Sequence, residues 1–409
     1  MEHRQASLRF ILITVFLDVM GIGLMIPVLP HLIGTLTTSP DLQAHWFGAL
    51  ATTYGIMQFF CAPLLGALSD RFGRRPVLLM SIFGLGLSYI ITSFTTSLIL
   101  LLLTRVVSGA TGASFSVANA YVADVTPPEK RGKGFGAVGA AFGIGFVFGP
   151  VIGGLLGDWN VRLPFMVAAG LSMINGLYGY FVLPESLPPE RRTALNLKRA
   201  NPFSALSYLS RLKGVGGLIL VFALTVQAQF ILQNTWVLYT EFRFGWTPRD
   251  NGMALFVVGL TSALTQGLLL GKLLKRFGEA RVALIGLTSG AIIYVAYGLV
   301  THSGFLYLLI LCNFLSFAAG PSLQALISKA ADPKEQGYTQ GALNAINSIM
   351  IITAPVIGTT ILATVNHLPH DDWRTGMTFF TCAAMQLLAL TVAIIHFYRL
   401  RQSRLTMLV

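Results

Sequence analysis

Long apolar stretches recur along the whole chain, and they constrain the fold more than any other feature. Each is about 20 residues long, the length that an α-helix needs to cross a hydrocarbon layer of about 30 Å. They lie near residues 8–29, 46–68, 76–97, 99–123, 134–156, 163–183, 215–239, 250–273, 280–300, 304–329, 338–365 and 375–398. The pattern predicts an all-α membrane protein with twelve transmembrane helices.

The composition excludes an ordinary soluble domain. Of the 409 residues, 54% are hydrophobic and 11% are charged, whereas soluble domains carry about 25% charged residues. The first apolar stretch keeps Asp18 in its middle and is too long for a cleavable signal peptide, so we expect it in the mature protein. Cys61, Cys312 and Cys382 lie within predicted crossings at spacings that fit no metal or redox motif. No cofactor, metal site or catalytic residue is expected.

The placement of the basic residues explains the formal charge of +12 without nucleic acid. Of the 28 lysines and arginines, 23 fall on the side of the predicted membrane that holds the N-terminus. Arg162, Arg243, Arg249 and Arg374 fall on the other side, and Arg105 lies inside a crossing. Cytoplasmic loops of membrane proteins are enriched in Lys and Arg. Both termini and the loop at 184–214 are therefore predicted to be cytoplasmic.

The two halves of the sequence repeat each other at an offset of 205 residues. The segment Gly66–Gly73 matches Gly271–Gly278 at five positions, and Pro150-Val151-Ile152-Gly153 returns as Pro355-Val356-Ile357-Gly358. A constant offset of half the chain indicates two copies of one unit, as in many transporters. We predict two pseudo-symmetric six-helix domains, residues 1–183 and 215–409, joined by a cytoplasmic linker at 184–214. The linker is rich in Pro, Arg and Lys, with a short surface helix expected near 202–212.

A patterned loop, GALSDRFGRRP, follows the second crossing at residues 66–76. It resembles the cytoplasmic signature of the major facilitator superfamily. The resemblance implies the fold of that family and a cytoplasmic gate made by Gly66, Asp70, Arg71, Gly73, Arg74 and Asp124. Gly66 and Gly73 would be tight-turn positions, Asp70 would face a helix N-terminus across the domain boundary, and Arg74 would pair with Asp124. The alternative is a solvated basic loop that only fixes orientation.

The second copy of this loop reads GKLLKRFGEAR at residues 271–281 and has Lys275 where the first copy has Asp70. We therefore expect the gate in the second half to be degraded.

The fifth crossing is crowded with glycines around a proline, in the run GIGFVFGPVIGG. Glycines four residues apart let helices approach closely, so packing alone could explain the run. It also resembles the motif of drug-exporting antiporters within the superfamily, which implies export. The residues of this motif are Gly145, Gly149, Pro150, Gly153 and Gly154.

Two ionisable residues lie deep within predicted crossings, Asp18 in the first and Arg105 in the fourth. A buried charge in a membrane is costly and indicates function. Burial without a partner would raise the pKa of Asp18 toward the range in which a proton gradient can load it. Alternatively, Asp18 pairs permanently with an arginine or is the counter-ion of a cationic substrate. Arg105 resembles an arginine implicated in proton coupling in the superfamily's drug exporters, or it ties helices together through backbone carbonyls.

Further segments resemble the tetracycline–proton antiporters, namely LDVMGIGLMIPVLP, WVLYTEFRFGW and PSLQAL, and the similarity runs nearly end to end. Polar amides in lipid need partners, so they are expected to face the interior of the bundle. Some of them could instead only join helices. The candidate substrate-binding residues are Gln58, Asn119, Gln229, Gln233, Asn234, Gln324 and Asn344. Aromatic residues such as Tyr89 could line a drug site, although such residues more often face lipid or the core.

The sequence departs from the tetracycline exporters at three places. Those proteins carry acids in the third and ninth crossings and a His in the eighth, whereas the aligned stretches here have Ser88, Gly290 and Ser262. The resemblance therefore does not by itself predict tetracycline as the substrate.

These features predict a proton-coupled secondary active transporter that exports amphipathic drugs, tetracycline-like or multidrug, by alternating access. The alternative is an importer or facilitator of an endogenous solute such as a sugar, peptide or siderophore. A third class, a receptor without flux, is disfavoured by the short loops. An enzyme is not predicted, and the absence of a GxxxxGK[ST] loop argues against ATP as the energy source.

The expected partners are a small-molecule substrate, protons and the lipid bilayer of a bacterial inner membrane, with no nucleic acid and a monomeric protein. Charged residues differ between the halves, since Asp18, Asp70 and Arg105 fall on Ala223, Lys275 and Ile310. The N-terminal half is therefore predicted to carry the gate and proton coupling. The C-terminal half is predicted mainly to shape the substrate cavity.

Overall fold

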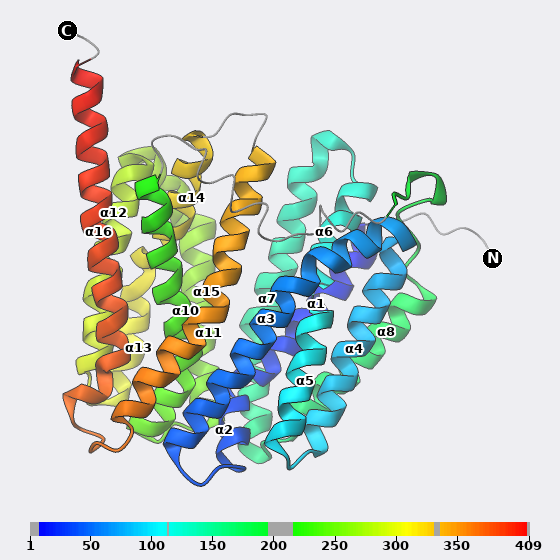
Figure 1. The fold of residues 1–409 in the computed structure, drawn as a ribbon, viewed down its shortest axis with the longest axis horizontal. Coiled ribbons are helices and arrows are strands. Elements are labelled where there is room, and N and C mark those ends of the chain that lie inside the picture. The colour runs from blue at the N-terminus through cyan, green and yellow to red at the C-terminus, as the bar shows by residue number, and fades with distance from the viewer. Residues whose placement is uncertain (1–7, 113, 195–215, 331–335, 407–409) are drawn as a thin grey trace. The chain divides into compact units, whose positions relative to one another are not determined.

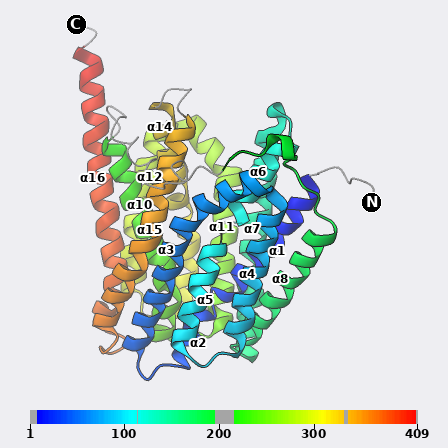
Figure 2. The same cartoon turned by 45° about the vertical axis from the view of Figure 1, so that its right-hand side comes forward.

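The computed structural model describes residues 8–112, 114–194, 216–330 and 336–406. All regular structure in these ranges is helical (Figures 1 and 2). The chain divides into two compact units. Unit 1 is Met1–Pro202 with Trp246–Gly259, and unit 2 is Phe203–Gly245 with Leu260–Val409. The surface helix expected near 202–212 lies outside the described residues.

Unit 1 is built from long helices that pack side by side. The helix α1 packs against α7 and α8, and α4 packs against α5 and α8. The elements are α1 (Leu8–Met25), α2 (Leu29–Gly34), α3 (Pro40–Phe72), α4 (Arg74–Phe94), α5 (Leu98–Thr111), α6 (Ser114–Val125), η1 (Pro128–Lys130), α7 (Arg131–Trp159), α8 (Leu163–Phe181) and η2 (Pro189–Arg191). The larger part of α11 (Pro248–Leu264), as far as Gly259, also belongs to this unit.

Unit 2 repeats this helical construction. The helix α10 packs against α15 and α16, and α12 packs against α14 and α16. The elements are α10 (Gly216–Phe244), the end of α11 from Leu260 onward, η3 (Thr265–Leu269), α12 (Leu270–Leu299), α13 (Ser303–Cys312), η4 (Asn313–Ala318), α14 (Ala319–Ala330), α15 (Gln336–Val365), η6 (Trp373–Gly376) and α16 (Met377–Thr406).

Each of the twelve predicted crossings coincides with a helix or with a run of consecutive helical elements. Within the described residues, ten helical segments are long and apolar enough to span a membrane. One of them, Pro248–Leu299, has 52 residues. At a rise of about 1.5 Å per residue, it is long enough for two crossings of about 30 Å. The helix α8 has 19 residues and accounts for the sixth predicted crossing. The chain is a multi-pass membrane protein.

Several helices are interrupted where the sequence predicted continuous crossings. The fourth crossing breaks after α5, where the N–H of Gly112 bonds to Gly109 O. The tenth contains the 3₁₀ segment η4, and the eighth contains the π-helical turn η3. The loop predicted between the eighth and ninth crossings is helical on both sides of Gly278, whose φ of 76° and ψ of 161° turn the chain. Glycine adopts this region of φ without steric cost.

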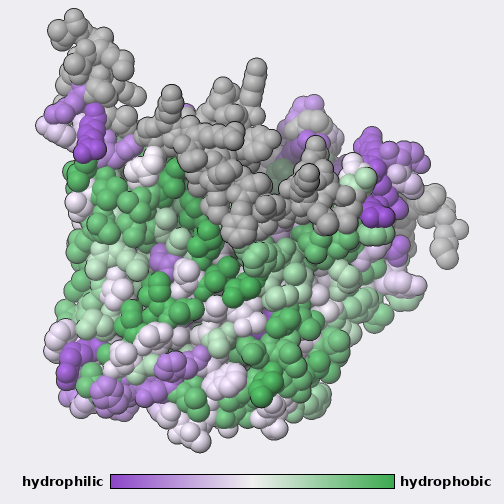
Figure 3. Space-filling model, viewed as in Figure 1, coloured by the Kyte–Doolittle hydropathy of each residue, from purple (hydrophilic) through white to green (hydrophobic). Residues whose placement is uncertain are grey.

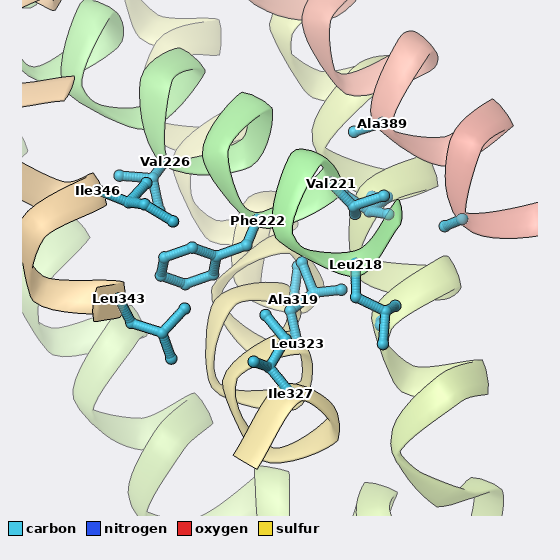
Figure 4. Close-up of a cluster of buried hydrophobic side chains, with 13 residues drawn as sticks. Leu218, Val221, Phe222, Val226, Ala319, Leu323, Ile327, Leu343, Ile346 and Ala389 are labelled. Carbon is cyan, nitrogen blue, oxygen red and sulfur yellow. The ribbon is translucent and has the colours of Figure 1, made fainter. Parts of the chain in front are cut away.

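Apolar side chains fill the interior of each unit. In unit 2, Phe222 of α10 lies among Val226, Leu343 and Ile346, as Figure 4 shows. Small residues such as Ala319 let α14 approach α10 at the same level. On the face seen in Figure 3, hydrophobic residues cover the middle of the helices and hydrophilic residues gather near the helix ends. This distribution is the one that a lipid bilayer requires.

Arg243, predicted to lie in an outer loop, is instead buried at the end of α10, with 6% of its surface exposed. Its Nη1 donates to Gly298 O at 2.9 Å and to the Thr375 hydroxyl at 2.7 Å. The guanidinium also lies over the ring of Tyr239, with 5.7 Å between Arg243 Cζ and the ring centroid. Arg243 therefore ties α10 to the end of α12 and to η6.

Candidate functional site

Arg74 is the centre of a polar network at the turn between α3 and α4. Its Nη1 lies 2.6 Å from Asp70 Oδ1, and its Nε donates to Asp124 Oδ2 at 3.1 Å. Nη1 also donates to the Ser69 hydroxyl at 2.6 Å. Only 10% of the Arg74 side chain is exposed. The pairing of Arg74 with Asp124 that the motif implies is thus present, whereas Asp70 pairs with Arg74 one helical turn away.

Gly73 makes the turn itself, and Gly66 does not. Gly73 has a φ of 106° and separates α3 from α4. Gly66 lies inside α3, and a methyl group added there would meet no atom within 4 Å. The prediction that Gly66 is a tight-turn position is therefore wrong, because α3 continues through it to Phe72. Arg71 is exposed and lies over the ring of Phe72, 5.1 Å from its centroid.

The first residues of the linker complete this network. Glu185 accepts hydrogen bonds from the main-chain N–H groups of Arg74 at 2.8 Å and Arg75 at 3.3 Å. The Ser186 hydroxyl donates to Asp124 Oδ2 at 3.1 Å, and Thr193 N donates to Asp70 O at 3.0 Å. Glu185 and Ser186 were not predicted from the sequence. An acid immediately after the sixth crossing was the available signal.

A second cluster lies inside unit 1, around Asp18 and Arg105. Asp18 on α1 is 5% exposed and Arg105 on α5 is 2% exposed. Both charges act electrostatically on the hydroxyls of Tyr54 on α3 and Tyr89 on α4. Arg105 Nη1 contacts Met25 Sδ at 3.5 Å. Four helices therefore bring one acid, one base and two phenols together in the apolar interior.

Two polar groups of this cluster have no hydrogen-bond partner within the described part of the chain, Arg105 Nη2 and the Tyr89 hydroxyl. Buried polar groups are normally bonded, and exceptions call for an explanation such as an ion, a water or a functional role. Tyr54 was missed by the sequence analysis, because a tyrosine in an apolar helix carries no pattern that sets it apart from core residues.

The glycine motif packs α7 against α1 at main-chain contact. A methyl group added to Gly149 would lie 2.8 Å from the Cα of Gly23, and one added to Gly145 would lie 3.1 Å from Phe16 O. Gly153 faces the main chain of Leu24 in the same way.

The next glycine serves another helix. Gly154 faces Pro248 and Gly252 at the beginning of α11, a stretch that clusters with unit 1. Pro150 lies within α7, and its ring would lie 3.0 Å from a methyl group on Gly23. The glycines of the motif are thus required for close helix packing, which is one of the two explanations given for this run.

The predicted amide residues differ in their hydrogen bonds and in their exposure. Gln324 Nε2 donates to Gln340 Oε1 at 2.9 Å, which joins α14 to α15. Asn234 Nδ2 donates to Phe230 O at 2.8 Å, and Gln58 Nε2 donates to Gly112 O at 3.5 Å. Asn119 is half-buried on α6. The exposed amides of unit 2 are Gln229, Gln233 and Asn344.

The three positions that depart from the tetracycline exporters have different surroundings. Ser88 is buried on α4 and donates to Thr104 O at 3.1 Å. Ser262 accepts a hydrogen bond of 2.8 Å from Gln266 beside the π-helical turn of α11. A methyl group added to Gly290 would lie 3.7 Å from the side-chain amide of Gln386. Neutral hydrogen-bonding groups therefore line these positions.

Comparison with known proteins agrees with this architecture. The family model described as Major Facilitator Superfamily matches residues 11–355. The chain is 40% identical to the tetracycline resistance protein, class C, of Escherichia coli, over 94% of this chain and 95% of that protein. It is 29% identical to multidrug resistance protein 2 of Bacillus subtilis (strain 168), over 90% and 92% of the two chains.

Solved structures also share the fold. The crystal structure of the nucleoside transporter NupG matches with a TM-score of 0.76 at 14% identity, and the match covers 95% of this chain and 98% of that one. On the family match and on its identity to these relatives, the chain belongs to the Major Facilitator Superfamily.

Proposed function

We propose that this protein is a proton-coupled secondary transporter that exports amphipathic drugs across a bacterial inner membrane. Its similarity to a tetracycline resistance protein and to a multidrug resistance protein supports drug export. Both relatives match along more than nine tenths of their own length, so the whole architecture is shared.

The observation that carries proton coupling is the burial of Asp18 and Arg105 inside unit 1, in one cluster with Tyr54 and Tyr89. A carboxyl group in an apolar bundle binds a proton more readily when its surroundings lose positive charge or water. A change in the position of Arg105 relative to Asp18 would therefore change the proton affinity of the carboxyl group. The bias that a proton exerts on transport equals the difference in its affinity between the two states.

The network around Arg74 serves as the cytoplasmic gate in this proposal. Ion pairs that exist in one state and break in the other shift the balance between inward-facing and outward-facing forms. The glycine contacts between α1 and α7 keep the helices that carry Asp18 and the motif at a fixed distance. The exposed amides Gln229, Gln233 and Asn344 supply hydrogen bonds to the drug.

The substrate range follows from the three neutral positions. Ser88, Ser262 and Gly290 offer no charge to a metal ion, so we propose a range that includes amphipathic drugs without a bound metal. The substrate range is tested by measuring the uptake of tetracycline, a cationic dye and an uncharged drug into inverted vesicles, each with and without an uncoupler.

The decisive variant is Asp18→Asn. We expect proton-driven uptake of the transported drug into inverted vesicles to fall to the level of vesicles without the protein. Asp158→Asn is the matched control, because Asp158 is exposed at the end of α7 and its replacement should leave uptake unchanged. Unchanged uptake by Asp18→Asn would refute proton coupling through this residue.

A further inference from the structure

A second ion pair, which the gate motif does not include, lies at the positions of the internal repeat that correspond to Arg74 and Asp124. At the offset of 205, Arg74 falls on Glu279 and Asp124 falls on Lys329. In unit 2, Lys329 Nζ pairs with Glu279 Oε1. Gly73 and Gly278, which precede Arg74 and Glu279, both have positive φ, 106° and 76°. The same turn thus carries an ion pair in each half.

The charges at the three corresponding positions of the second half are opposite in sign. Asp70, Arg74 and Asp124 are negative, positive and negative, whereas Lys275, Glu279 and Lys329 are positive, negative and positive. Lys275 precedes Glu279 by four residues, as Asp70 precedes Arg74. Lys275, Glu279 and Lys329 thus differ in sign from Asp70, Arg74 and Asp124, and an ion pair is kept between the last two positions. The expectation of a degraded gate in the second half stays a prediction.

Helix electrostatics explains how both signs are tolerated. The N-terminus of a helix carries a partial positive charge, which favours an acid and disfavours a base. Arg74 and Arg75 begin α4, and Glu185 supplies the missing negative charge by accepting from their N–H groups. Glu279 begins the helical stretch after Gly278, so its own negative charge lies at the helix N-terminus.

The two pairs differ in exposure. The side chains of Arg74 and Asp124 are 10% and 20% exposed, whereas those of Glu279 and Lys329 are 28% and 67% exposed. Exposed ion pairs contribute little to stability, because water competes for both charges. An exposed pair that joins two helices can also open and close without burying an unpaired charge.

We propose that Glu279 and Lys329 form a charge-inverted positioning pair of the second half, which holds the end of α14 against the turn at Gly278 in one state of the transport cycle and releases it in the other. The proposal rests on the transport function proposed above. It assigns no substrate contact to either residue.

The test uses the full-length protein with Glu279→Lys, Lys329→Glu and the double variant that exchanges the two charges. Each single variant places two like charges together, so we expect the initial rate of drug uptake to fall about tenfold, within the usual range of coupling between sites. The double variant should return to within about threefold of the wild type, because the pair is restored with opposite polarity. Arg281→Glu, which changes an exposed charge in the same segment by the same amount as Lys329→Glu, should transport normally.

A second readout does not depend on the substrate. Amide hydrogen exchange of the purified variants in lipid nanodiscs should accelerate next to Gly278 and at the end of α14 in both single variants, and recover in the double variant. The melting temperature should stay unchanged in all of them, which separates positioning from folding.

The results distinguish failure of the proposed export function from failure of the proposed positioning pair. If the wild-type protein transports neither tetracycline nor the cationic dye nor the uncharged drug, the export function is refuted. Amide hydrogen exchange alone then tests the positioning pair. If both single variants matched the wild type in amide hydrogen exchange and in drug uptake, the positioning pair would be overturned. A double variant that recovers in neither readout would also overturn it.

Discussion

Glu185 is the residue whose loss should most clearly weaken the turn between α3 and α4. It accepts hydrogen bonds from four main-chain N–H groups, those of Arg74, Arg75, Ser186 and Leu187. Losing a helix cap costs about 1 kcal/mol. Glu185→Gln removes the negative charge but keeps the shape, so we expect the melting temperature in detergent to fall by about 2–4 °C.

The control for this variant is Glu190→Gln. Glu190 lies five residues further along and is exposed, so the same chemical change should leave the melting temperature within error. Equal melting temperatures for Glu185→Gln and the wild type would show that the negative charge of Glu185 contributes nothing to the stability of this turn.

At the level of single residues, the sequence predicts contacts that a motif describes and misses those that the fold creates. The pairing of Arg74 with Asp124 follows from the resemblance to a known loop pattern, and it is present at 3.1 Å. Its role as a gate stays a prediction. Glu185 lies 111 residues from Arg74 in sequence, and no local pattern links them. The pair of Glu279 and Lys329 was not predicted, because its charges are opposite to those of Arg74 and Asp124 at the corresponding positions of the repeat.

Helix packing leaves no room for a methyl group at Gly149 of α7. The methyl group of Gly149→Ala would lie 2.8 Å from Gly23 Cα and 3.0 Å from Met20 O, both of them main-chain atoms that cannot rotate away. The helices α1 and α7 must then separate, at a cost of about 1–3 kcal/mol. We expect a lower melting temperature and, because α1 carries Asp18, a lower transport rate.

The same helix offers a matched control in Gly143→Ala. A methyl group at Gly143 meets no atom within 4 Å. Alanine is a better helix former than glycine by up to about 1 kcal/mol, so this variant should be neutral or slightly stabilising. If both variants behaved alike, helix propensity rather than close packing would determine the stability of α7.

Helix positions were predictable because a lipid bilayer allows few alternatives for twenty consecutive apolar residues. The interruptions were not. The break at Gly112, the 3₁₀ segment Asn313–Ala318 and the π-helical turn Thr265–Leu269 lie in stretches as apolar as their neighbours. Hydropathy reports the length of a crossing, whereas local hydrogen bonds and packing decide where its helix breaks.

For the whole molecule, the charge distribution predicts which loops face the cytoplasm, and this can be tested by labelling. Glu190→Cys lies in the predicted cytoplasmic linker and Asp371→Cys in a predicted outer loop, and both positions are exposed. In a background where Cys61, Cys312 and Cys382 are replaced by alanine and transport is retained, a membrane-impermeant maleimide is applied to intact cells. We expect Asp371→Cys to react at once and Glu190→Cys only after permeabilisation.

This pair of positions also tests the number of crossings. Between residues 190 and 371 the sequence predicts five crossings, an odd number, so the two sites must lie on opposite sides of the membrane. The 52-residue segment Pro248–Leu299 is the critical one. If it crossed only once, the count would be even and both cysteines would react from the same side. If instead Glu190→Cys alone reacted in intact cells, the count would hold and the orientation derived from the 23 basic residues would be inverted.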